Sequence, residues 1–272
     1  MGSGGDAMVA TVCLRLAFGL VAPLNLLDSK PIPPRFFRIQ LLVSLGLLAV
    51  AGYFLSGSQP INLDIDGVWL FNGVGVKWFW IAFSASAVVC FLGCLVWHLD
   101  RAPGGTRIIR LASCCLAFVL FLITPFHCPE SVDWWRLGDN FASAAMLGVA
   151  TTAMMLGHSY LISPTMTIAP LLKLLIALAG VLALRVTLAT WALYWWTSEH
   201  PLGNLETETL LWLIARWVLG ILAPLALGWM AWETARIRST QSATGILYVV
   251  VIVTFLGELT SLLLLEKTGY PL

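Results

Sequence analysis

Residues 170–194 read PLLKLLIALAGVLALRVTLATWALY and carry only two charged side chains, Lys173 and Arg185. A bilayer hydrocarbon core about 30 Å thick is crossed by roughly 20 apolar residues in a helix. Because lipid offers no water to the backbone N–H and C=O groups, a run of this kind must satisfy them internally. The stretch therefore predicts a transmembrane helix.

Similar apolar runs recur along the whole chain. Of its 272 residues, 59% are hydrophobic and 11% are charged, whereas ordinary soluble domains have about 45–50% and about 25%. Proline- and glycine-containing segments separate the runs, because proline removes a backbone donor and fixes φ. We predict an all-α membrane protein, one polytopic domain over residues 1–272, with a bundle of eight transmembrane helices near residues 8–27, 36–57, 78–98, 107–126, 137–162, 170–194, 208–232 and 241–265.

The charges between these runs predict the orientation, since Lys and Arg are retained on the cytoplasmic side during insertion. One set of connections holds nine cations and three acids: Lys30, Arg35, Arg38, Arg101, Arg107, Arg110, Lys173, Arg236 and Arg238, with Asp28, Asp100 and Glu233. The alternating set, with both termini, holds three cations and ten acids: Lys77, Arg136 and Lys267, with Asp6, Asp64, Asp66, Glu130, Asp133, Asp139, Glu199, Glu206, Glu208 and Glu266. We therefore predict both termini on the outer (periplasmic or extracellular) side of the cell membrane, the inner membrane in a Gram-negative cell.

After the charges near the span ends are assigned to the connections, four ionisable residues remain within the predicted spans: Arg15, Arg185, Arg216 and Glu258. A charge at a helix centre costs about 2.5–3.5 kcal/mol on insertion scales, so such residues usually face the bundle interior and pair. Counting about 1.5 Å per residue places all four in the outer half of the bilayer. We predict that they converge, that Arg216 and Glu258 form an ion pair, and that the remaining positive charge binds a ligand.

Two interpretations of these four residues remain open. As a purely structural feature, they would set helix packing, with Arg15 and Arg185 reaching toward the membrane surface. As a binding site, three arginines against one glutamate favour an anionic or hydrogen-bond-accepting ligand, such as a quinone carbonyl, a haem propionate, a lipid phosphate or a carboxylate. In the seventh run, Gly220, Pro224 and Gly228 predict a kink and a close helix contact, because Pro224 cannot donate to the Gly220 carbonyl.

Other candidate sites have weaker signals. His98 and His158 are potential haem or metal ligands at predicted helix ends, although interfacial histidines that bond a carbonyl are the simpler interpretation. Four thiols, Cys90, Cys94, Cys114 and Cys115, lie at similar depth, but adjacent residues of a helix face different ways, so small core residues are favoured over a metal site. Residues 62–67 begin like a calcium loop that lacks its final glutamate. In the connection 58–77, apolar and polar residues alternate over 61–66, which predicts a short strand or hairpin.

The function predicted from these features is that of an integral membrane subunit of an electron-transfer complex, of the respiratory type. It would bind a quinone-like or haem-like ligand near Arg185, Arg216 and Glu258 and receive electrons from partner subunits, since its connections are short. The alternative is a secondary transporter for a small organic anion, and a membrane enzyme acting on a lipid-linked phosphate is a third possibility. The net charge of +1 argues against a nucleic-acid partner, and the sequence does not decide whether the protein is an enzyme.

Overall fold

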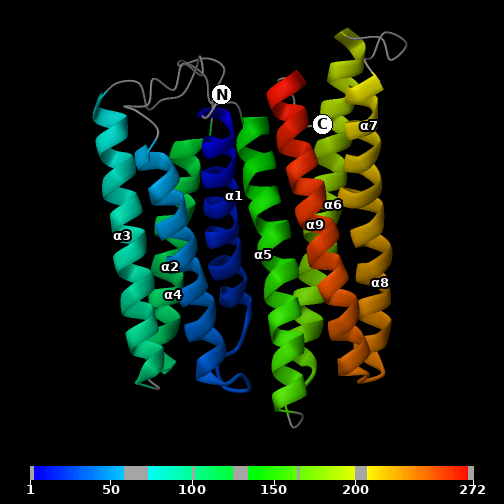
Figure 1. Ribbon diagram of the computed structural model, residues 1–272. Coiled ribbons are helices and arrows are strands. Elements are labelled where there is room, and N and C mark those ends of the chain that lie inside the picture. Colours follow the sequence, from blue (N-terminus) through cyan, green and yellow to red (C-terminus); the bar gives the residue numbers. More distant parts are fainter. Residues whose placement is uncertain are drawn as a thin grey trace. The chain divides into compact units, whose positions relative to one another are not determined.

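The computed structural model describes residues 3–57, 73–99, 102–124, 134–163, 166–199 and 207–268. Nearly all of these residues are helical (Figure 1). The elements, in chain order, are α1 (Ser3–Val21), η1 (Ala22–Leu26), α2 (Pro34–Gly57), α3 (Gly73–His98), α4 (Ala102–Ile123), α5 (Trp134–Ile162), α6 (Ala169–Glu199), α7 (Thr207–Trp217), η4 (Val218–Leu222), α8 (Ala223–Arg236) and α9 (Thr240–Thr268).

The predicted number of membrane spans is confirmed within the described part of the chain. Eight helical segments are long and apolar enough to cross a membrane, with α1 and η1 forming one span and α7, η4 and α8 another. The side of the membrane that each terminus faces stays a prediction. The strand and calcium-loop predictions fall on residues 58–72, which lie outside the described residues, whereas residues 73–77 belong to α3.

Every described span begins one to five residues earlier than its apolar run indicated. Helix α4 starts at Ala102 and includes Pro103 in its first turn, where proline is tolerated because its missing N–H would have no intrahelical partner. Helix α5 starts at Trp134. As a result, Asp139, which the sequence analysis assigned to an outer connection, lies in the second turn of α5 and is only 5% exposed.

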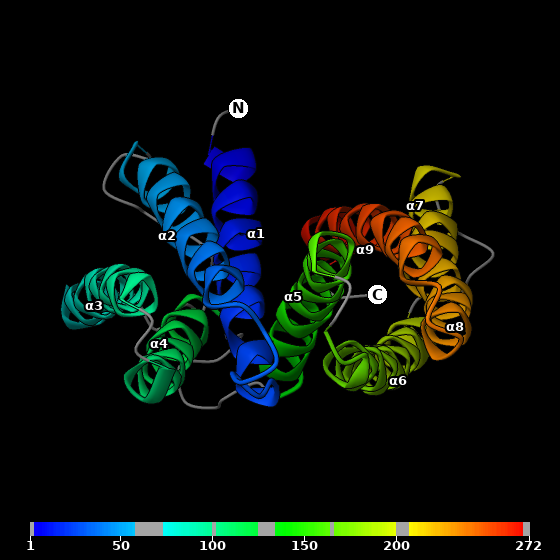
Figure 2. The same cartoon turned by 90° about the horizontal axis from the view of Figure 1, so that it is seen from below.

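The chain divides into two compact units, Met1–Gly148 and Val149–Leu272, and the prediction of a single domain stays a prediction. Unit 1 contains α1 to α4 and the first part of α5. Its helices α1, α2, α3 and α4 form a closed ring of neighbours, in which each helix contacts the next and α4 returns to α1 (Figure 2). The first part of α5 packs on α1 through a Phe18–Phe141 edge-to-face contact and the close approach of Gly19 to Gly148.

Unit 2 contains the rest of α5 and helices α6 to α9. Helix α9 packs against α7, η4 and α8, and α6 packs against α8. The last part of α5 reaches α9 at Gly157, where a Cβ atom would lie 2.8 Å from Oγ1 of Thr244. Along α6 and along α9, the buried residues recur every three or four positions and so lie on one face of each helix. A charged residue on that face must point toward the neighbouring helices.

The seventh span is interrupted where its proline predicted an irregularity. Residues Val218–Leu222 form a π-helical segment, η4, and the backbone N–H of Ala223 bonds the Val218 carbonyl. Pro224 follows in the first turn of α8. Segments of this type accommodate a missing α-helical hydrogen bond and occur frequently at functional sites.

Candidate functional site

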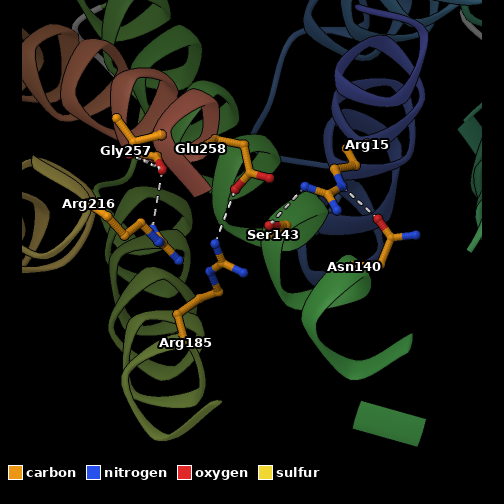
Figure 3. A network of polar contacts seen from close by, with 8 residues as sticks. Arg15, Asn140, Ser143, Arg185, Arg216, Gly257 and Glu258 are labelled. Carbon is orange, nitrogen blue, oxygen red and sulfur yellow. Dashed lines mark hydrogen bonds and ion pairs between the residues drawn. The ribbon is translucent and has the colours of Figure 1, made fainter. Parts of the chain in front are cut away.

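A buried ion pair joins α6 and α9 inside unit 2. Nη2 of Arg185 lies 3.2 Å from Oε2 of Glu258, and the two residues are 1% and 4% exposed. Arg185 continues the buried stripe of α6 that includes Leu178 and Leu182, so its side chain is directed into the unit rather than toward lipid. Figure 3 shows the Arg185 guanidinium pointing at the Glu258 carboxylate.

A second arginine reaches the same turn of α9 from α7. Arg216 is 1% exposed and donates from Nη1 to the carbonyl oxygen of Gly257, at 3.5 Å, next to Glu258 (Figure 3). The structure therefore brings Arg185, Arg216 and Glu258 together, and we call these three residues the α6–α7–α9 cluster. The established partner of Glu258 is Arg185, and a direct Arg216–Glu258 ion pair stays a prediction.

Two glycines allow this approach. A Cβ atom on Gly257 would overlap Cα of Gly220, and a Cβ atom on Gly220 would lie 2.5 Å from Nη1 of Arg216. The absence of both side chains lets the backbones of η4 and α9 meet and leaves room for the Arg216 side chain between them. The close helix contact predicted for Gly220 is therefore confirmed, whereas its partner Gly257 was not identified from the sequence.

Buried hydroxyl and indole groups lie close in sequence to this cluster. Thr254, one turn before Glu258 on the same face of α9, is 3% exposed, and Trp217 directly follows Arg216. Within the described residues, Oγ1 of Thr254 and Nε1 of Trp217 have no hydrogen-bond partner. An unsatisfied buried polar group costs about 1–3 kcal/mol, so these groups favour a polar ligand or water nearby.

Arg15 belongs to unit 1 and has its own buried partners there. Its Nε donates to Oδ1 of Asn140 at 2.6 Å, and its Nη1 donates to the Ser143 hydroxyl at 3.4 Å (Figure 3). Asn140 in turn donates to Oγ1 of Thr124, the residue directly after α4, at 2.7 Å. Arg15 thus links α1 to α5 inside unit 1, and its convergence with the α6–α7–α9 cluster stays a prediction.

The polar partners of Arg15 were missed in the sequence analysis. Asn140 was not singled out, and the adjacent Asp139 was assigned to a connection, although the structure buries both in α5. A signal was present: Asn140 and Ser143 are three residues apart, so they share one face of any helix that contains them. Asp139 and Asn140 both lie inside the predicted run 137–162, but Asp139 was assigned to the outer connection because it is a charged residue near the end of that run. The sequence does not show whether a polar side chain at such a place packs against another helix.

We expect Asn140→Ala to lower the free energy of unfolding by about 1.5–3 kcal/mol, the usual range for a hydrogen bond to a charged group. Ser143→Ala is the matched comparison, because its 3.4 Å contact with Arg15 is long and should contribute less than about 1 kcal/mol. Denaturation of the two variants in mixed micelles measures both values. Equal losses for the two variants would contradict the assignment of Asn140 as the main partner.

Within the described residues, the histidine and cysteine candidates do not form one group of metal ligands. His98 is exposed at the end of α3 and accepts at Nδ1 from Nη1 of Arg38, at 2.7 Å, whereas His158 is exposed in unit 2. The thiols of Cys90, Cys94, Cys114 and Cys115 are free. Among the described residues, no three His, Cys, Asp or Glu side chains are grouped to hold a metal ion, and haem ligation by His98 or His158 stays a prediction.

Comparison with known proteins assigns neither a family nor a function to the chain. No protein family, curated protein or solved structure matches the chain.

Proposed function

We propose that the α6–α7–α9 cluster binds a quinone-like ligand and that the chain is an integral membrane subunit of an electron-transfer complex. The observation that carries this proposal is the meeting of two arginines, each 1% exposed, with one glutamate among spanning helices. Guanidinium groups donate strong hydrogen bonds to carbonyl and anionic oxygens. A quinone carbonyl is such an acceptor, and a haem propionate would use the same donors.

In this proposal the residues of the cluster have distinct roles. Arg216 donates to the ligand oxygen, Arg185 holds Glu258 in place, and Glu258 carries a proton to or from the ligand. The Thr254 hydroxyl, one turn away, supplies a further hydrogen bond. Because the connections between the helices are short, partner subunits would deliver the electrons. Both termini would face the outer side, which places Arg216 and Glu258 nearer that surface.

The proposal is tested by purifying the protein with its partners from native membranes in mild detergent. We expect solvent extraction to release a quinone, or optical spectra to show a haem. The Arg216→Gln variant should bind the ligand about 10- to 100-fold more weakly, because one charge-assisted hydrogen bond is lost. Glu208→Gln is the control, since Glu208 is an exposed acid that pairs with Lys267.

Two results would overturn the proposal. One is a chain that purifies alone, colourless and free of quinone. The other is an Arg216→Gln variant that keeps its ligand at the wild-type level while remaining folded.

A second function is favoured by the π-helical segment η4, which lies between Arg216 and Pro224. Secondary transporters bind their substrates where spanning helices are interrupted, so the chain could carry a small organic anion bound to Arg216. Uptake of labelled succinate or benzoate into proteoliposomes tests this. Uptake that is lost in Arg216→Ala supports transport at this cluster, and no uptake of either anion argues against the class.

A further inference from the structure

A second feature of unit 2, separate from the α6–α7–α9 cluster, is a groove between α6 and α8. Its volume is about 810 Å³, and its walls are five residues of α6 from Leu175 to Leu182 and six residues of α8 from Leu225 to Trp232. The two helices contact each other and are neighbours in Figure 2. Every lining side chain is apolar or an indole, apart from Gly228, which has no side chain.

Buried leucines of α6 form the base of the groove, and small residues leave space beside its large exposed side chains. Ala179, Ala226 and Gly228 lie among its lining residues, whereas Ile176 and Trp229 are 59% and 67% exposed. Both walls belong to candidate membrane spans. At that depth an apolar groove excludes water, so a hydrocarbon chain is the occupant that its chemistry favours.

Cations lie at one end of the groove, one turn beyond each wall. Lys173 is three residues before Ile176 on α6, and Arg236 is four residues after Trp232 on α8. Residues three or four apart share a helix face, so both cations extend the groove walls. Arg236 pairs with Glu233 at 3.3 Å, with both side chains largely exposed, and Arg238 follows in the turn before α9. Among the described residues of unit 2, the charged groups at this end are these three cations and Glu233.

From this arrangement we infer that the groove binds one anionic phospholipid. An acyl chain lies between α6 and α8, and the phosphate group lies at Lys173 and Arg236, where the helices end and the headgroups begin. Basic positions between spanning helices at headgroup level attract anionic lipids. The inference does not depend on the proposed electron-transfer function, because none of these residues belongs to the α6–α7–α9 cluster.

The experiment compares phosphatidylglycerol with phosphatidylcholine of the same acyl chains, added to the delipidated full-length protein in detergent. Native mass spectrometry counts the bound lipids, and thermal denaturation measures their stabilising effect. We expect phosphatidylglycerol to be retained preferentially and to raise Tm more. The Lys173→Gln/Arg236→Gln variant should bind phosphatidylglycerol about tenfold more weakly than the wild type. The control Lys30→Gln/Arg35→Gln, which removes the same charge from unit 1, should bind it as the wild type does.

A second variant tests the groove itself. Ala179→Phe places a large side chain in the groove without changing any charge, and we expect it to lose the bound phosphatidylglycerol while remaining folded. The inference is overturned if the two lipids bind equally, if either groove variant binds like the wild type, or if inorganic phosphate displaces the lipid. It is also overturned if a long-chain quinone displaces the lipid, or if cross-linking shows a second copy of the chain covering the groove.

Discussion

Arg185→Gln is expected to lower the free energy of unfolding by about 3–5 kcal/mol, which is the typical cost of removing one partner from a buried ion pair. The Glu258 carboxylate would lose its 3.2 Å contact with Arg185, and burial among spanning helices denies it compensation by water. Titration with SDS in mixed micelles measures this loss through the midpoint of unfolding.

The double variant Arg185→Gln/Glu258→Gln should recover most of the lost stability, because it removes both charges instead of stranding one. The exposed pair between Lys267 and Glu208 is the matched control, and Lys267→Gln should leave the unfolding midpoint unchanged. If Arg185→Gln lowered the free energy of unfolding as little as Lys267→Gln, the Arg185–Glu258 pair would not contribute to stability. If the double variant were as unstable as the single one, charge stranding would be the wrong explanation.

Gly148→Ala and Gly257→Ala form the second prediction, and each is expected to cost about 3 kcal/mol or more, the upper end of the range for overpacked cores. A Cβ atom at residue 148 would overlap the backbone of Gly19, and one at residue 257 would overlap Cα of Gly220. Backbone atoms cannot turn aside as a flexible side chain can, so the helices must separate. The same SDS titration measures the loss in each unit.

The controls are two glycines that have open space around them. Among the described residues, no atom beyond the adjoining residues and backbone of the same helix lies within 4 Å of a Cβ atom built on Gly46 or Gly180. Alanine at either position should leave stability unchanged or raise it by up to about 1 kcal/mol, because glycine is the weaker helix former. Equal effects at Gly148 and Gly180 would show that helix propensity, and not helix contact, determines the result.

Part of the site could be predicted from the sequence. A charged residue in the middle of an apolar run would be costly in lipid, and its position within the run is visible in the sequence. Arg185, Arg216 and Glu258 were identified as buried charges in this way, and the structure brings them together. Asp139 shows the limit of the method: it is as polar as a connection residue, and only the packing of α5 buries it. Gly257 and Asn140 were missed because their importance comes from another helix, not from their own neighbours.

The sequence by itself determined that the chain is helical and that it contains eight segments able to span a membrane, because hydrophobic length and internal backbone hydrogen bonding are properties of each segment alone. Tertiary structure alone decided that Arg185 pairs with Glu258 and that Arg216 bonds the adjacent Gly257 carbonyl. Two arginines at similar depth are equivalent in the sequence. What each arginine contacts depends on which faces of α6 and α7 turn toward α9, and helix contacts such as that of Gly220 with Gly257 set those faces.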